Sequence, residues 1–138
     1  MNDLSEVEPG KITTHYATTQ EEKESIYRFR YHIYVNEMGK DISDADHDKG
    51  WLYDDMDDTA TLIYAKCDDQ VIATLRYNQG GQTEFSQYWS DIYQLDKFSD
   101  FPIENLSLSS RIMVAKEWRG SSALGAILAE VYVYSRKQ

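Results

Sequence analysis

Residues 106–128 read LSLSSRIMVAKEWRGSSALGAIL and carry the strongest structural signal in this chain. The first part, Leu106 to Ala115, predicts a buried strand. A small-residue turn follows at 118–122, and a helix is predicted from Ala123 to Arg136. The apolar face of that helix is expected to hold Leu124, Ile127, Leu128, Val131 and Tyr134. Backbone amides at such a helix N-terminus, with Arg119 beside them, form a phosphate-binding pattern, although such turns are more often plain capping.

The elements before this stretch alternate between strand and helix patterns. Thr18 or Thr19 caps a helix that ends near Met38, and its apolar stripe contains Ile26, Phe29, Ile33 and Tyr34. Residues 40–58 are a long loop rich in Asp, and residues 79–106 are irregular apart from a short helix near 85–95. The remaining predicted strands are 12–17, 60–66 and 71–78. This order predicts an α/β fold with a mixed sheet.

Composition excludes several classes of protein. The net charge is −10, which argues against general binding of nucleic acid or anionic membranes. Residues 111–138 nevertheless carry +3, from five Lys/Arg and two Asp/Glu, and would attract an anionic ligand. The single Cys, the lack of an apolar run long enough to span a membrane and the polar N-terminus predict a cytoplasmic protein. We expect a flexible tail at 1–10 and one domain over 11–138.

This layout, together with the segment IMVAKEWRGSSALGAIL, resembles the GNAT N-acyltransferase superfamily. The family's loop for the acyl-CoA pyrophosphate usually reads Arg-Gly-x-Gly; Arg119-Gly120 matches it, and Ser122 stands at the second Gly. The resemblance implies a mixed, mostly antiparallel sheet flanked by helices, which is expected to be incomplete at its C-terminal end. It also implies an acyl-CoA or acyl-carrier-protein thioester as co-substrate. The implied donor-binding residues are Val114, Ala115, Arg119, Gly120, Ser121, Ser122, Ala123 and Gly125.

A narrower resemblance covers residues 27–76. The segments YRFRYHIYVNEMGK, DADHDKG, DDMDDTATLIYAK and VIATLRYN are similar to the branch of bacterial N-acyl amino acid synthases and acyl-homoserine-lactone synthases. Those enzymes transfer a fatty acyl group from acyl carrier protein, or sometimes CoA, to an amine. Leu108 stands where lactone synthases carry a Glu, which favours the branch that acylates amino acids. The motif residues fall on Arg30, Tyr34, Asp54, Asp57, Arg76, Ser110 and Arg111.

Acyl transfer to an amine needs a base and a donor for the developing oxyanion. The resemblance implies that a strand amide near Val114 or Ala115 polarises the thioester carbonyl. The expected catalytic residues are Glu37, Asp54, Asp57 and Arg76, with the three acids as candidate bases. The expected substrate-binding residues are Arg30, Tyr34 and Arg111, whose arginines could instead pair with the acids. In the simpler alternative, Arg30, Asp54, Asp57 and Arg76 pin the long loop to the sheet, Glu37 is a solvated helix residue and Tyr34 is core.

Two other interpretations are open. Residues 44–55 partly resemble an EF-hand loop, but Lys49 occupies the glycine position and Asp55 the position of the bidentate Glu, so no metal is expected. The chain could also be a non-catalytic or incomplete binding module that completes its sheet with another chain, including a second copy of itself. The other expected partners are a small-molecule amine and, for an enzyme of this branch, acyl carrier protein.

Overall fold

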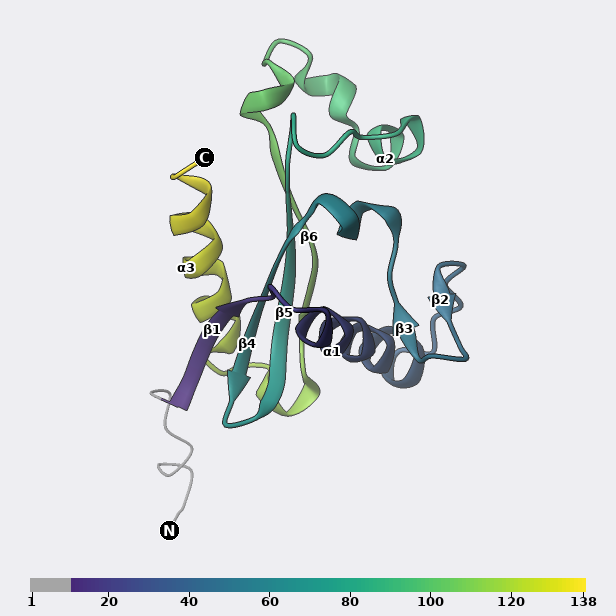
Figure 1. Cartoon of the computed structure of the whole chain (residues 1–138), viewed down its shortest axis with the longest axis vertical. Coiled ribbons are helices and arrows are strands. Elements are labelled where there is room, and N and C mark those ends of the chain that lie inside the picture. Colours follow the sequence, from purple (N-terminus) through teal and green to yellow (C-terminus); the bar gives the residue numbers. More distant parts are fainter. Residues whose placement is uncertain (1–10) are drawn as a thin grey trace.

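The centre of the structure is a four-stranded antiparallel sheet with the order β1-β4-β5-β6 (Figure 1). The computed structural model describes residues 11–138, so the expected tail at 1–10 lies outside the described residues. The strands are β1 (Ile12–Tyr16), β4 (Thr61–Cys67), β5 (Gln70–Gln79) and β6 (Ser107–Val114). The predicted fold class is confirmed: an α/β domain with an antiparallel sheet flanked by helices.

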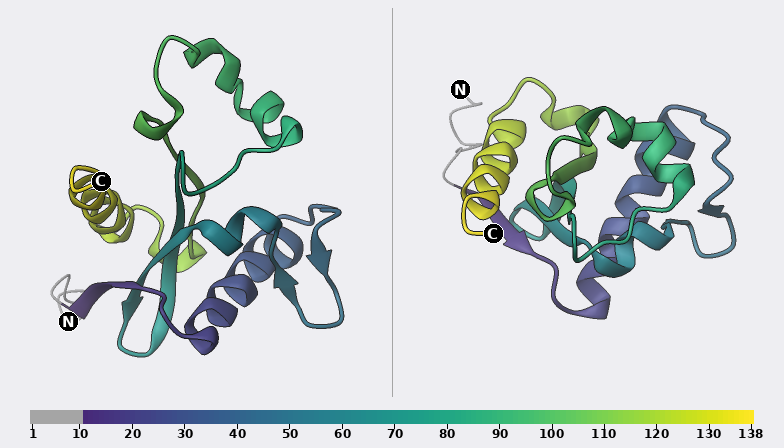
Figure 2. Two further views of the ribbon diagram at one scale, coloured as in Figure 1. Left: turned by 45° about the horizontal axis from the view of Figure 1, so that its top comes forward. Right: turned by 90° about the horizontal axis from the view of Figure 1, so that it is seen from above.

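Two helices cover opposite faces of this sheet (Figure 2). Helix α1 (Gln20–Tyr31) packs on the face that carries Leu62 and Tyr64. Helix α3 (Ala123–Ser135) packs on the other face, where Ile63 and Ala65 point. This division follows from the two-residue period of a strand, which sends neighbouring side chains of β4 to opposite sides.

Helix α1 begins where the sequence predicted and ends in a different geometry. Thr19 and Glu22 form a complete capping box at its start. After Tyr31 the helix continues as a π-helix, η3 (His32–Glu37), which stops close to the predicted end at Met38. Ile26 and Ile33 are buried, whereas Phe29 and Tyr34 of the predicted stripe are only partly buried.

Strand β6 corrects the prediction of a buried strand. Only Ser110 and Met113 are buried along it, because β6 is the last strand of the sheet and nothing among residues 11–138 pairs with its outer edge. Its register against β5 shifts by one residue between Thr74 and Arg76. Arg111 lies opposite this irregularity with a left-handed φ of 52°. The extra residue is a β-bulge, a feature that re-aims a side chain.

Helix α3 corrects the predicted apolar face. Ala123, Ile127 and Val131 are buried against the sheet, four residues apart on one stripe. Leu124 and Leu128 are 39% and 41% exposed. Each follows a buried position by one residue, and one residue along an α-helix turns the side chain by about 100°, away from the sheet.

The two long loops carry short elements of their own. Residues 40–59 form the hairpin β2 (Ala45–Asp46) and β3 (Trp51–Leu52), then a 3-10 helix, η4 (Asp55–Thr59). The carboxylate of Asp46 accepts the amides of Asp48 and Lys49 and so stabilises the turn. Residues 80–106 hold α2 (Gln87–Tyr93), η5 (Leu95–Phe98) and η6 (Ile103–Asn105), and η7 (Lys116–Trp118) leads toward α3. None of the described helices has the length and apolarity that a membrane crossing requires.

Candidate active site

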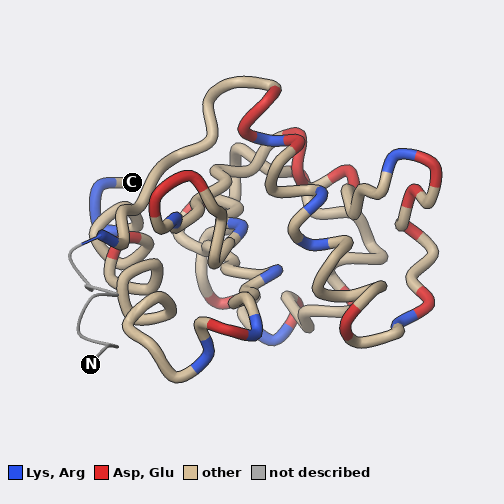
Figure 3. Tube along the Cα trace, turned by 90° about the horizontal axis from the view of Figure 1, so that it is seen from below, with Lys and Arg blue, Asp and Glu red and all other residues tan. Residues whose placement is uncertain are grey.

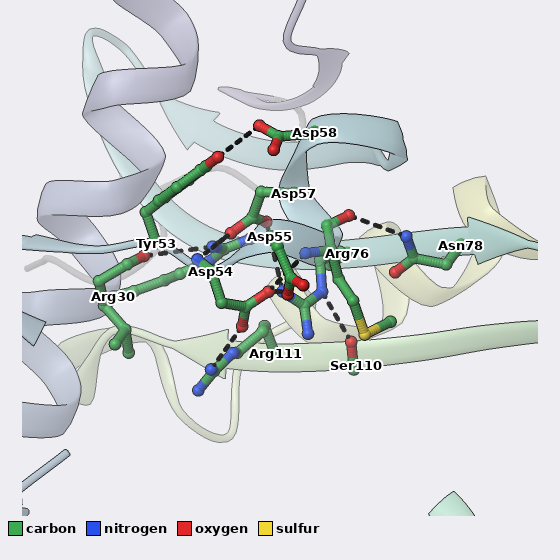
Figure 4. Close-up of polar contacts among 12 residues, drawn as sticks. Arg30, Tyr53, Asp54, Asp55, Asp57, Asp58, Arg76, Asn78, Ser110 and Arg111 are labelled. Carbon is green, nitrogen blue, oxygen red and sulfur yellow. Dashed lines mark hydrogen bonds and ion pairs between the residues drawn. The ribbon is translucent and has the colours of Figure 1, made fainter. Parts of the chain in front are cut away.

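Five charged side chains from four separate segments meet on the α1 side of the sheet (Figure 4). Arg30 contacts Asp57 at 2.9 Å, and Arg76 contacts Asp54 at 2.6 Å and Asp57 at 3.5 Å. Arg111 contacts the second oxygen of Asp54 at 2.8 Å. The structure therefore brings together five of the residues that the sequence singled out, although 81 positions separate Arg30 from Arg111.

The short helix η4 aims both carboxylates inward. Asp54 is the N-cap of η4, and its carboxylate accepts a hydrogen bond from the backbone amide of Met56. The carboxylate of Asp57 accepts one from the backbone amide of Asp54, at 3.0 Å. This reciprocal capping box orients both side chains toward β5. There Arg76 lies on the same face as Thr74 and Asn78, and all three are fully buried. Asn78 donates to the carbonyl of Met56 at 2.9 Å, which adds a further tie between η4 and the sheet.

Burial divides the network into an inner and an outer part. Arg30 and Arg76 are fully buried, and Asp57 is almost so. Arg30 also donates to the carbonyl of Leu52, at the end of β3. These three residues pin the 40–59 loop to the sheet, as the simpler alternative expected. Asp54 and Arg111 lie nearer the surface, and the side chain of Arg111 is 13% exposed.

Asp54 stays ionised in this setting. Burial alone would raise the pKa of its carboxyl, but the hydrogen bond and charge of Arg76, and then those of Arg111, hold that pKa below its usual value. A carboxylate with a lowered pKa is a weak proton acceptor. Asp54 is therefore poorly suited to remove a proton from an amine.

A hollow of about 470 Å³ opens beside Asp54. Asp54 and Asp55 border it on one side, and Ser86, Tyr88 and Trp89 of the α2 region on the other. The indole N–H of Trp89 donates to Asp55 at 3.0 Å, and the Trp89 ring lies 5.8 Å from the guanidinium of Arg76. The sequence predicts a short helix near 85–95 but gives Trp89 no role at the site; Ser86, which caps α2, is the local signal for this helix.

The predicted phosphate turn presents free amides at the start of α3. Gly120 has a left-handed φ of 85°, which only glycine adopts without strain. The hydroxyl oxygen of Ser121 accepts a hydrogen bond from the backbone amide of Ala123, so this amide is not available to a ligand. The amides of Ser122, Leu124 and Gly125 have no hydrogen-bond partner in the part of the chain that the structure describes. Such amides, at the positive end of a 13-residue helix, suit an anion.

Of the two amides expected to polarise a thioester, only one is free. The Ala115 amide donates to the carbonyl of Ile72 at 2.8 Å. The neighbouring residue, Val114, is paired with Ala73 of β5. Bonded and non-bonded pairs alternate in an antiparallel ladder, so the N–H and C=O of Val114 point away from β5, toward the open edge. The Nε of Arg119 donates to this Val114 carbonyl at 3.1 Å, which agrees with that orientation.

Glu37 lies apart from the acids of the network, whereas Tyr34 lies beside one of its arginines. Glu37 contacts Arg119 at 3.2 Å and His32 at 3.4 Å. Tyr34 places its ring 5.8 Å from the guanidinium of Arg111. Glu37 therefore belongs with the phosphate turn rather than with Asp54 and Asp57.

The basic residues of the last 28 positions do not form one patch. Arg111 belongs to the ion-pair network and Arg119 to the turn before α3, whereas Arg136 and Lys137 lie at the far end of α3 (Figure 3). A helix of this length spans about 20 Å. An anion bound at the turn therefore contacts Arg119 and the helix amides, and it does not interact directly with all the basic residues that give residues 111–138 their net charge of +3.

Comparisons with known proteins bear on the family and the fold of the chain. A family model described as an acetyltransferase (GNAT) domain matches residues 29–129. A solved structure of a CoA-dependent acyl-homoserine lactone synthase, BjaI, with SAM and isopentyl-CoA, has the same fold, with a TM-score of 0.70 and 20% sequence identity. The match covers 92% of this chain and 61% of that one, so this chain spans less than two thirds of the synthase. No curated protein sequence matches. Because the family model covers well over half of the sequence, the chain belongs to the GNAT acetyltransferase family.

Proposed function

We propose that this chain is an N-acyltransferase that moves an acyl group, of the fatty acyl class, from a thioester to the amine of an amino acid. The observation that carries the proposal is the position of the Val114 amide. It points to the open edge of β6, and the carbonyl of the same residue accepts a hydrogen bond from Nε of Arg119, in the turn before α3, at 3.1 Å. A thioester whose phosphates occupy the turn would thus have an oxyanion donor nearby.

The turn supplies what a pyrophosphate needs. The amides of Ser122, Leu124 and Gly125 have no hydrogen-bond partner among residues 11–138, and Arg119 offers a guanidinium that is about half exposed. A guanidinium binds phosphate oxygens through paired hydrogen bonds. Acyl-CoA carries such phosphates, and acyl carrier protein presents a phosphate on its prosthetic arm. Both donors fit this chemistry, and the experiment below separates them.

The hollow beside Asp54 is the proposed acceptor site. An amine arrives mostly as a cation, and the carboxylates of Asp54 and Asp55 that border the hollow would orient it. Arg111 is the outermost cation of the network and would hold the acceptor's carboxylate. In the reaction the amine loses a proton, its nitrogen forms a bond to the carbonyl carbon, and the carbon–sulfur bond breaks. The proton and the thiolate leave together as the free thiol.

A second candidate function has a separate observation behind it. The outer edge of β6 has no partner among residues 11–138, and Leu124, Leu128 and Tyr132 lie exposed along α3. An open strand edge and exposed apolar side chains are each features that favour pairing with another chain. A non-catalytic module that docks through this edge would bind no thioester donor.

Calorimetric titration with CoA, and separately with acyl-loaded carrier protein, tests the proposal. We expect wild-type protein to bind one of the two in the micromolar range. Arg119→Ala should weaken that binding about 10-fold or more, since a charge-assisted hydrogen bond contributes about 1.5–3 kcal/mol. Lys116→Ala is the matched control, because Lys116 is an exposed cation in the same segment and forms no ion pair with any described residue. Binding of neither donor would refute the proposal and favour the docking module.

A further inference from the structure

We propose that Glu37 competes with the donor phosphates for Arg119, and thereby sets donor affinity. This inference rests on the proposed function, because it assigns a regulatory contact to the same donor site. Glu37 is paired with Nη2 of Arg119, the arginine of the phosphate turn. A donor phosphate that binds through Nη2 must therefore displace Glu37.

The geometry makes Glu37 the better-fixed partner of the pair. One carboxylate oxygen lies 3.2 Å from Nη2 of Arg119, and the other lies 3.4 Å from Nε2 of His32. The side chain of Glu37 is 20% exposed, against 49% for Arg119. Arg119 is the more exposed and longer side chain of the two, so it is the group that can turn toward a ligand while Glu37 stays in place.

The position of Glu37 in its own helix supports a role beyond helix formation. Glu37 is the last residue of η3, and a carboxylate at a helix C-terminus faces the negative end of the helix dipole. The segment is also a π-helix, which is rare and is often found at functional sites. An acidic side chain in this unfavourable position needs a compensating contact elsewhere in the structure. Arg119, 82 positions later, supplies that contact.

The ion pair is also linked to Val114, whose amide is the proposed oxyanion donor. Arg119 donates through Nε to the carbonyl of Val114 while Nη2 is held by Glu37. A phosphate that takes the hydrogen bonds of Nη2 replaces the contact with Glu37. Glu37 thus lowers the affinity for both the acyl donor and the free thiol product, which carry the same phosphates.

The experiment is a double-mutant cycle on CoA affinity, measured by calorimetry on the full chain. Glu37→Gln keeps the shape of the side chain and removes its charge. It should tighten CoA binding about two- to five-fold, which corresponds to the strength of a solvent-exposed ion pair. In the Arg119→Gln background the same change should have no effect. Glu117→Gln is the matched control, since Glu117 is an exposed acid close to the turn that forms no ion pair with any described residue.

Each outcome bears on a different statement. Weaker or unchanged binding by Glu37→Gln would overturn the competition. Equal tightening by Glu37→Gln and Glu117→Gln would overturn it too, because the effect would then come from net charge alone. Tightening that persists without Arg119 would show that Glu37 acts on another group and would also reject the inference. Absence of CoA binding in every variant would instead reject the CoA-dependent form of the proposed function, and the competition with it.

Discussion

Replacing Arg76 by Met tests whether the buried network holds the 40–59 loop on the sheet. Arg76 is fully buried, and its guanidinium contacts Asp54 at 2.6 Å, Asp57 at 3.5 Å and the hydroxyl of Ser110 at 3.0 Å. Methionine matches the length of the apolar part and offers no charge. After the substitution Asp54 keeps its ion pair with Arg111, and Asp57 keeps its ion pair with Arg30. Each carboxylate therefore loses one ion pair and retains another.

The expected loss of stability is large for one substitution. Removing one partner of a buried ion pair costs about 3–5 kcal/mol, and the remaining partners place this change near the lower value, about 3 kcal/mol. For a chain of this size that corresponds to a fall in melting temperature of roughly 10 °C. Since domains are stable by about 5–15 kcal/mol, the variant should still fold.

Urea unfolding followed by tryptophan fluorescence measures this loss, with Arg119→Met as the control. Arg119 is about half exposed, and losing its ion pair should cost less than about 1 kcal/mol. Adding Asp54→Asn to Arg76→Met should cause a further loss of stability rather than a recovery, because it leaves Arg111 without the carboxylate that it contacts at 2.8 Å. The reasoning is refuted if Arg76→Met lies within about 1 kcal/mol of wild type, or if the double variant is more stable than the single one.

Two further predictions concern acid stability and glycines. The pKa of Glu22 is lowered from 4.5 to about 2 by a hydrogen bond from Tyr64 and by backbone amides, so its contribution is present above pH 4.5 and is lost as the pH falls toward 2. The stability difference between wild type and Glu22→Gln, from unfolding curves at pH 6 and pH 2.5, should shrink at the lower pH; a constant difference contradicts this assignment. A Cβ at Gly80 would lie 1.9 Å from the carbonyl oxygen of Ile103, whereas one at Gly125 meets nothing within 4 Å. Gly80→Ala should therefore destabilise the chain by more than about 2 kcal/mol, and Gly125→Ala should stabilise it by about 0.5–1 kcal/mol in thermal melts. A loss of stability for Gly125→Ala would contradict the open geometry at the start of α3.

The residues of the network show how far sequence reasoning reached into the site. The resemblance to the family placed Arg30, Asp54, Asp57, Arg76 and Arg111 together. Their division into buried and accessible members was not readable, because it depends on which strands and loops cover each one. Arg76 gave one local hint: it alternates with Thr74 and Asn78 along β5, so three polar side chains share one face of an otherwise apolar strand.

The donor turn shows the same limit at the level of single atoms. The sequence indicated Val114 or Ala115 as the polarising amide. Only the register against β5 shows that Ala115 is bonded to Ile72 and that Val114 faces the open edge. Likewise, Glu37 was grouped with the acids of the loop, and its actual partner Arg119 lies on a different element.

Local chemistry in the sequence determined the order of the elements and their ends. The capping box of Thr19 and Glu22, the Arg119-Gly120 turn and the periodicity of β4 and β5 are short-range signals, which act through neighbouring residues. Tertiary structure alone decided which strand lies at the sheet edge, which stripe of α3 is buried and which acids meet which arginines. These outcomes depend on contacts between residues that are distant in the sequence, and desolvation and register act only once the chain has packed.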